Sequence, residues 1–230
     1  MTVLGLDGCK SGWVVVVADK TRFVDAFVAP NIASAAQTGA QRWQATVMVV
    51  DIPIGIPDSG KRAADTEARA FTKPRSSSVF STPVRAALEA ASYDAARAAS
   101  IAATGGTSLS KQAWAIGDKI LEVDAFAKSA TLTVREGHPE VSFRAMSDAP
   151  IEHYKKTFAG ATLRMSLLEG EGLSLNPDHG VLRTRGVDLD DFLDAGAMAW
   201  TARRVDQGLA ASMPAVPEVF SDGWRSAIWY

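Results

Sequence analysis

The sequence has little cysteine, no long apolar run and no excess of charge of either sign. Cys9 is the only cysteine in 230 residues, which excludes an internal disulfide framework or cysteine-rich metal site and favours the reducing cytoplasm. No segment approaches the roughly 18 uninterrupted apolar residues of a membrane span, and the N-terminal run, interrupted by Asp7, does not fit a secretory signal. The formal net charge of -2 gives no overall attraction to polyanions, so any polyanion must be bound by a local patch.

Several common catalytic motifs are also missing. The chain contains no G-x-x-x-x-G-K-[ST] phosphate loop and no G-x-G-x-x-G fingerprint, so the strongest signals of nucleoside triphosphate and dinucleotide binding are lacking. No serine lies in a strand-turn-helix G-x-S-x-G context, and Cys9 lies in a predicted turn without an evident histidine base. Nucleophilic catalysis is therefore poorly supported.

The hydrophobic patterning predicts an α/β fold in a single domain spanning residues 1–230. Apolar runs at 3–6, 14–17 and about 23–28, joined by tight turns, predict three antiparallel strands. Asn31 suits the N-cap of a helix that ends near Trp43. Two parallel strands are predicted at 46–50 and 131–135, separated by a helical insertion at about 61–129. Helical patterns are predicted within the insertion at 61–71, 84–103 and 111–127, and after the last strand at 156–169 and 189–207.

Acidic residues follow two predicted strands and occupy one face of the last helix. If the first and fourth strands are parallel neighbours, Asp7 and Asp51 lie at equivalent carboxyl ends, within about 6 Å of each other. Asp191 and Asp194 share a helical face at i, i+3. Buried carboxylates must be protonated, paired with a cationic side chain or bound to a cation, and magnesium and manganese prefer such oxygen ligands. These four residues are therefore the predicted metal ligands. The alternative is that Asp before Gly, as at Asp7, is a common turn residue and that the acids at 188–191 form an N-cap.

Two further groups of residues extend this candidate site. Glu140 follows the predicted fifth strand and is either another ligand, an acid/base or a helix-start acid. Arg62 and Arg75 are candidate phosphate contacts within a cationic stretch, for which the alternative is a solvated helix face. The cations of this stretch, around the serines 76–78, are Lys61, Arg62, Arg69, Lys73, Arg75 and Arg85.

The ordered motifs GLDGCKSGWVVV, DIPIGIPDSGKRAADTEAR, PRSSSVFSTPVRAALEA, LSKQAWAI, REGHPEVSF, DFLDAGAMAWTAR and the terminal IWY resemble an uncharacterised family of predicted nucleases. The predicted order of elements is that of a ribonuclease H-like fold, a mixed five-stranded sheet with three antiparallel strands followed by parallel ones and flanked by helices. The resemblance implies the same fold. It also implies acidic site residues at Asp7, Asp51, Glu140 and Asp194. The possible substrate contacts that it implies are Arg75, Ser77, Lys111 and Gln112.

Three functions remain open at this point. The first is a nuclease with bound magnesium or manganese, in which one ion activates water, another stabilises the leaving oxygen, and the substrate is nucleic acid or a small phosphoester. The second is an actin-like phosphotransferase or ATP-binding protein that grips phosphate with the DGCKSG turn. The third is a catalytically silent nucleotide- or nucleic-acid-binding module. In any of these, Leu193, Ala197 and Trp200 are expected to face the sheet.

Overall fold

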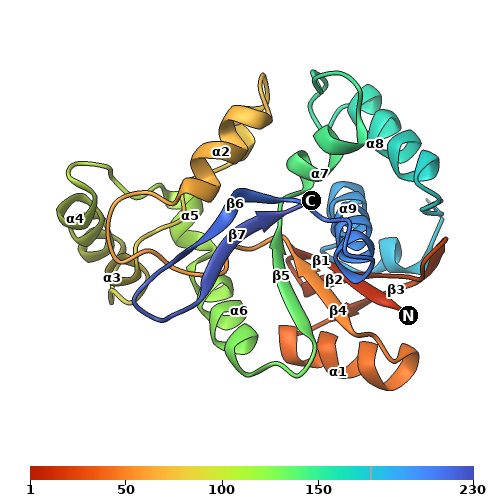
Figure 1. Ribbon diagram of the computed structural model, residues 1–230, viewed down its shortest axis with the longest axis horizontal. Helices are drawn as coiled ribbons and strands as arrows, with labels where there is room; N and C mark the ends of the chain where they lie inside the picture. Colours follow the sequence, from red (N-terminus) through yellow and green to blue (C-terminus); the bar gives the residue numbers. More distant parts are fainter. Residues whose placement is uncertain (177) are drawn as a thin grey trace.

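The computed structural model describes residues 1–176 and 178–230, whose strands form one mixed sheet in the order β3-β2-β1-β4-β5-β7-β6 (Figure 1). The strands are β1 (Val3–Cys9), β2 (Gly12–Ala18), β3 (Phe23–Ala29), β4 (Val47–Val50), β5 (Thr133–Gly137), β6 (Ser212–Val219) and β7 (Arg225–Trp229). The α-helices are α1 (Ile32–Trp43), α2 (Ala63–Phe71), α3 (Arg85–Leu88), α4 (Tyr93–Thr104), α5 (Lys111–Ala115), α6 (Gly117–Ser129), α7 (Pro139–Met146), α8 (Phe158–Gly170) and α9 (Leu189–Asp206). Two short 3-10 helices are η1 (Ser76–Ser78) and η2 (Gly180–Arg183).

The predicted antiparallel meander and the parallel strands after it are confirmed. β2 pairs antiparallel with both β1 and β3, whereas β4 runs parallel to β1 and β5 runs parallel to β4. The predicted N-cap is also confirmed, because the Asn31 side chain accepts a hydrogen bond from the backbone N of Ser34 at 2.8 Å. The carboxyl ends of β1, β4 and β5 consequently lie at one edge of the sheet.

Helices cover both faces of the sheet because its central strands are apolar on both sides. Alternate side chains of a strand point to opposite faces, so Val14 and Val16 of β2 pack with residues of α7, α8 and α9. Val15 and Val17 pack with residues of α1 and α6 on the other face. Figure 1 shows α1 and α9 on opposite sides of β1, β2 and β4.

The helix α9 lies unusually close to β1. A Cβ atom at Gly5 would overlap the backbone of Ala195 and Ala199, so glycine is needed where this helix crosses the strand. The expected phase of the helix is confirmed, since Leu193, Ala197 and Trp200 are all buried in the core on this face of the sheet.

The sheet has seven strands, so the prediction of five is wrong. The two additional strands, β6 and β7, continue the sheet beyond β5, with β7 parallel to β5 and antiparallel to β6. Pro214 and Pro217 within β6 suppress its sequence signal, and prolines are tolerated there because β6 is the edge strand.

The helices α2 to α6 lie between β4 and β5, where a helical insertion is predicted, but they are more broken than expected. The predicted helix 84–103 is divided into α3 and α4, and the predicted helix 111–127 is divided into α5 and α6. The helix α7 was predicted only as one alternative for Glu140, and it begins directly after His138, which serves as its N-cap. In the described part of the chain, no helix combines the length and apolar character needed to cross a bilayer.

Candidate functional site

A cavity of about 620 Å³ lies at the carboxyl ends of β1 and β4. Its acidic lining residues are Asp7, Asp51, Glu140, Asp188, Asp191 and Asp194. Its basic lining residues are Lys10, Arg75, Lys119 and Lys155, and His138 and Tyr154 also line it. All five acidic residues that the sequence predicts for the site therefore face one space.

Strand register places Asp7 and Asp51 side by side. β1 and β4 pair from Val3 opposite Val47 to Leu6 opposite Val50, and the next residues along the two strands are the two aspartates. The backbone N of Asp51 donates to the carbonyl of Leu6 at 3.0 Å, which continues the ladder to this point. Parallel pairing of two apolar strands thus places both aspartates in the lining of one cavity. Their separation of about 6 Å stays a prediction.

Close packing of α9 brings the third carboxylate to the same place. Leu4 and Leu6 face the α1 side of the sheet, so Gly5 and Asp7 face α9. Asp194 directly precedes Ala195, whose backbone approaches Gly5. Asp7 is 8% exposed and Asp194 is 2% exposed, so both carboxyl groups lie largely out of water.

Burial perturbs all three carboxyl groups. It raises the pKa of Asp51 to about 7 and the pKa of Asp194 to about 7, against an ordinary value of 3.8. It also raises the pKa of Asp7 well above that value, and the negative charges of Asp51 and Asp194 add to the effect. Three carboxylates are consequently costly here at neutral pH unless cations compensate them.

Lys155 supplies one such cation. Its Nζ donates a hydrogen bond to Asp194 Oδ2 and lies 3.4 Å from Asp190 Oδ2. Burial opposes the lysine charge, but the attraction of Asp194, Asp7 and Asp51 is greater and raises the pKa of Lys155. The lysine is therefore an ammonium ion that lies among the carboxyl groups, and it leaves two negative charges when all three acids are ionised.

Glu140 is in the cavity wall but is already compensated. Nη2 of Arg164 donates to Glu140 Oε1 at 2.6 Å and to Oε2 at 2.9 Å, and both side chains are buried. The backbone N of Glu140 donates to Nδ1 of His138 at 3.2 Å, at the N-cap of α7. Burial lowers the pKa of His138, so its imidazole is neutral. The helix-start position weighed for Glu140 is thus realised, together with its place in the cavity.

Asp191 also combines a structural position with a place in the cavity. Its Oδ2 accepts a hydrogen bond from the backbone N of Asp188 at 3.0 Å, which caps the start of α9. Asp191 lies at the edge of the cavity, where burial raises its pKa. The N-cap arrangement expected as the alternative for this acidic stretch is therefore present.

The predicted substrate contacts are divided by the structure. Arg75, Ser77 and Gln112 line the cavity, whereas Lys111 is exposed and lies outside its lining. Arg62, which the sequence places among the phosphate contacts, instead lies in the interior at 1% exposure.

Arg62 is buried because two acids converge on it. Its Nη2 donates to Glu136 Oε1 and to Asp65 Oδ1, each at 2.6 Å. Glu136 Oε2 in turn accepts from the backbone N of Ile54 at 2.7 Å, in the loop that follows Asp51. None of the three residues of this ion cluster lines the cavity.

Three cations at the centre and rim were missed by sequence reasoning. Lys155 lies in the irregular segment between α7 and α8, and Lys10 lies in the turn after β1. Lys119, on α6, donates from Nζ to the carbonyl of Gly12 at 2.8 Å. Lys155 and Lys119 line the same cavity as the carboxylates only because distant segments fold together, whereas Lys10 is three residues from Asp7 in the DGCKSG turn.

The oxygen donors of the cavity suit a hard cation, although the side chains do not form a complete set of metal ligands. Among the described residues, no three His, Cys, Asp or Glu side chains are arranged so that they hold one metal ion together. Oxygen donors from Asp7, Asp51, Asp191 and Asp194 nevertheless face the same space. Carboxylates of this kind are the ligands that magnesium and manganese prefer.

A family model matches the chain over residues 5–219, and its description is protein of unknown function (DUF429). The match includes every acidic residue of the cavity and extends from β1 to the end of β6. No curated protein and no solved structure matches the chain closely enough to count as a relative.

Proposed function

We propose that this chain, which belongs to the family described as protein of unknown function (DUF429), is a divalent-metal-dependent phosphodiesterase that acts as a nuclease. The observation that carries the proposal is the charge of the cavity. Asp7, Asp51 and Asp194 contribute three carboxyl groups, and Lys155 contributes the ammonium that contacts them. When all three carboxyl groups are ionised, Lys155 leaves two of their negative charges uncompensated. One divalent cation balances this charge.

Asp7, Asp51 and Asp194 are the residues that would hold the cation, with Asp191 at the edge of the site. Magnesium usually keeps several waters and binds through one or two carboxylates plus phosphate oxygens of the substrate. A site of this kind does not need three protein ligands placed in advance. When bound, the cation supplies Lewis-acid stabilisation of a phosphoryl oxygen and lowers the pKa of a bound water.

The cations of the cavity suit a phosphodiester substrate. Among the described residues, the guanidinium of Arg75 has no hydrogen-bond acceptor, and its Nε is buried. The Ser77 side chain lies beside it in the lining and adds a neutral donor. Arginine offers planar, charge-assisted donors that fit phosphate oxygens. Lys155 has a second role in this function. When Asp194 binds the divalent cation, the ammonium of Lys155 becomes free to contact a phosphate oxygen.

The topology supports the finer assignment to a ribonuclease H-like fold. Three antiparallel strands are followed by parallel strands, and α9 crosses β1 so that its acidic residue meets the carboxylates at the strand ends. Cys9, the single and buried thiol, suits a reducing compartment such as the cytoplasm.

Hydrolysis of a panel of single-stranded, duplex and structured DNA and RNA, with a small chromogenic phosphodiester, tests the proposal. We expect turnover only with magnesium or manganese, and we expect Asp7→Asn to abolish it, since the amide keeps the shape but loses the charge that binds the cation. Asp148→Asn, at an exposed residue, is the matched control and should keep full activity. The absence of turnover on the whole panel would contradict the proposal.

A catalytically silent binding module is the second candidate, and the contact of Lys155 with Asp194 favours it. In that function the lysine permanently compensates the acids, so no cation is needed. Calorimetric titration with manganese separates the two candidates. Heat of binding that disappears in Asp7→Asn supports the enzyme, and no heat with wild-type protein supports the module.

A further inference from the structure

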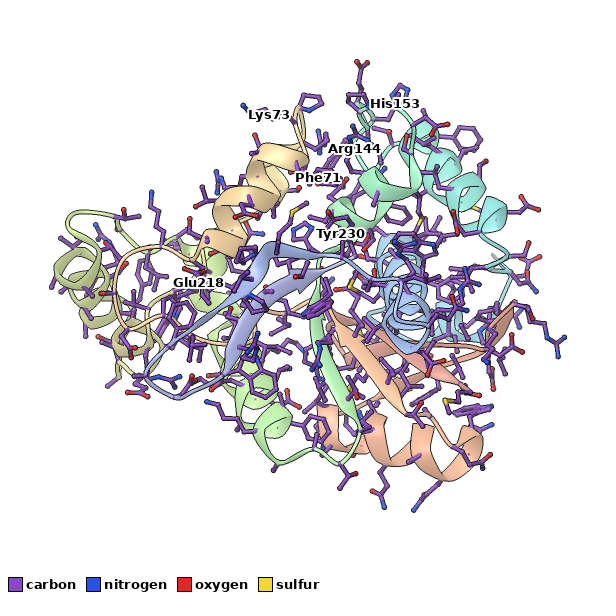
Figure 2. All side chains as sticks on the ribbon, viewed as in Figure 1. Phe71, Lys73, Arg144, His153, Glu218 and Tyr230 are labelled. Atoms are coloured by element: carbon purple, nitrogen blue, oxygen red, sulfur yellow. The ribbon has the colours of Figure 1, made fainter. Side chains whose placement is uncertain are left out.

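The cationic stretch from Lys61 to Arg85 is not one patch in the folded chain. Arg75 lines the carboxylate cavity, Arg62 is buried in its ion cluster, and Arg85 pairs with Asp222 at 2.8 Å. The three remaining cations are Lys61, Arg69 and Lys73, and they line a separate hollow of about 500 Å³ beside α2. Figure 2 shows Lys73 at the outer end of α2, away from the sheet.

These three cations lack acidic partners. No carboxylate in residues 1–176 or 178–230 lies within 4.0 Å of the charged nitrogens of Lys61, Arg69 or Lys73. The acid in the lining of this hollow is Asp65, and it is already bound, since Oδ1 accepts from Arg62 at 2.6 Å and Oδ2 from the backbone N of Thr82 at 2.7 Å. The hollow therefore presents uncompensated positive charge.

A third space adjoins both this hollow and the carboxylate cavity. It has a volume of about 260 Å³ and shares Lys61, Arg69 and Ser81 with the hollow. It shares Ser77 and Phe80 with the cavity. We call the hollow and this joining space together the outer groove. The outer groove borders the carboxylate cavity and carries the unpaired cations, and its walls include serine and threonine residues.

We propose that the outer groove binds the phosphates of a single-stranded nucleic acid whose reacting phosphodiester lies in the carboxylate cavity. This inference rests on the proposed function, because the cavity defines where the strand begins. A small phosphoester would fit entirely within the cavity and would not reach the three cations beyond it. A chain of phosphates accounts for both, since its backbone continues past the reacting bond.

The burial of the acids explains why the strand is single. Asp7 and Asp194 are almost fully covered, so a phosphodiester must enter the cavity to reach them. The backbone of a duplex is fixed on a rigid helix and cannot bend into such a space, whereas an unpaired strand can. Positive grooves that follow the backbone are the usual means of holding single strands.

The salt dependence of binding tests the outer groove. Fluorescence anisotropy with a labelled twelve-nucleotide thymidine strand, in chelator so that no turnover occurs, compares wild-type protein with the double variant Lys61→Gln/Lys73→Gln. Each phosphate contact to a single strand contributes about 0.7 to the slope of log affinity against log salt, so the double variant should lose about 1.4. Arg69 is left unchanged because its Nη1 donates to the carbonyl of Val79 at 2.6 Å and shapes the wall.

The double variant Lys20→Gln/Arg183→Gln is the matched control, since it removes two exposed cations that do not line the outer groove. Its slope should equal that of wild type. An unchanged slope in Lys61→Gln/Lys73→Gln, or an equal loss in the control, overturns the inference. Equal binding of a duplex of the same length, with the same loss of slope, overturns the assignment to single strands.

Hydrolysis of a small chromogenic phosphodiester with manganese separates this inference from the proposed function. Lys61→Gln/Lys73→Gln should hydrolyse it like wild type, because neither lysine lies in the cavity. Turnover of the small ester with no loss of slope contradicts the outer groove alone. A loss of slope in a protein that hydrolyses nothing contradicts the nuclease proposal and leaves the outer groove supported.

Discussion

Replacement of Lys155 by glutamine isolates the electrostatics of the cavity. The change removes the ammonium that contacts Asp194 and leaves the buried Asp7 and Asp194 and the half-buried Asp51 without it. Removing one partner of a buried ion pair costs about 3–5 kcal/mol. The Lys155 side chain keeps 29% of its exposure, so we expect a loss of about 3 kcal/mol in the free energy of unfolding when the carboxylates are charged.

This loss should depend on pH with a definite sign. Asp51 and Asp194 have pKa values of about 7 in the folded chain and 3.8 when unperturbed. A raised pKa contributes stability that is complete below the unfolded value and is lost as the pH rises through the folded value. At about pH 5 both groups are protonated in the folded wild-type chain, so the variant loses only a hydrogen bond of about 1 kcal/mol. Above about pH 8 the full loss of about 3 kcal/mol appears.

Urea unfolding at about pH 5 and pH 8, with chelator and with manganese, measures the effect. Manganese should restore most of the lost stability at the higher pH and should bind Lys155→Gln more tightly than wild type, because the ammonium no longer competes for Asp194. Lys156→Gln is the control, since that lysine is 55% exposed and lies 3.5 Å from Asp190, which limits its contribution to less than about 1 kcal/mol. An equal loss at both pH values would refute the reasoning, because the carboxylates would then not titrate between them.

Two further substitutions test how the site is positioned. Gly5→Ala should force α9 away from β1, because the added Cβ overlaps the backbone of Ala199. We expect it to lower the free energy of unfolding in urea by at least about 1–3 kcal/mol and to weaken manganese binding. Gly170→Ala, whose added Cβ meets open space, should do neither. Arg62→Met leaves Glu136 buried without its cation and should cost about 3–5 kcal/mol above the pKa of that carboxyl, which burial raises, with recovery at lower pH. Failure of low pH to restore Arg62→Met would show that lost packing, not the unpaired charge, causes the instability.

The sequence predicted the acidic part of the site because strand register is a local property repeated over several residues. Asp7 and Asp51 each end an apolar run, and parallel pairing makes those ends equivalent. The phase of α9 was also predictable, because a helix with apolar residues at 193, 197 and 200 has one face to bury. Periodicity therefore gave both the strands and the helix that carry Asp7, Asp51 and Asp194.

The cations could not be placed in the same way, since their positions depend on contacts between distant segments. Arg62 reads as a surface residue in a polar loop, and only the arrival of Glu136 from β5 makes its burial favourable. Lys155 lies in a segment without periodicity, and it reaches Asp194 because α8 packs against α9. The strand β6 was missed for a local reason, its two prolines, which are tolerated only at an edge.

The acids of the cavity destabilise the fold that holds them, and this is a reason to regard them as functional. The pairing of β1 with β4 positions the backbone of Asp7, and the packing of α9 over Gly5 positions that of Asp194. Each carboxylate also accepts one hydrogen bond, Asp7 from the backbone N of Gly8 and Asp194 from Lys155. Burial nevertheless raises the pKa of both groups, which means that the charged forms lower the stability of the folded chain at neutral pH. Active sites commonly trade stability for activity in this way.

Asp7→Asn should accordingly melt at a higher temperature than wild type in chelator at about pH 8. Addition of manganese should reverse that order, because only wild type binds the cation. A variant that melts lower than wild type under both conditions would show that Asp7 supports the turn after β1 and contributes no binding site.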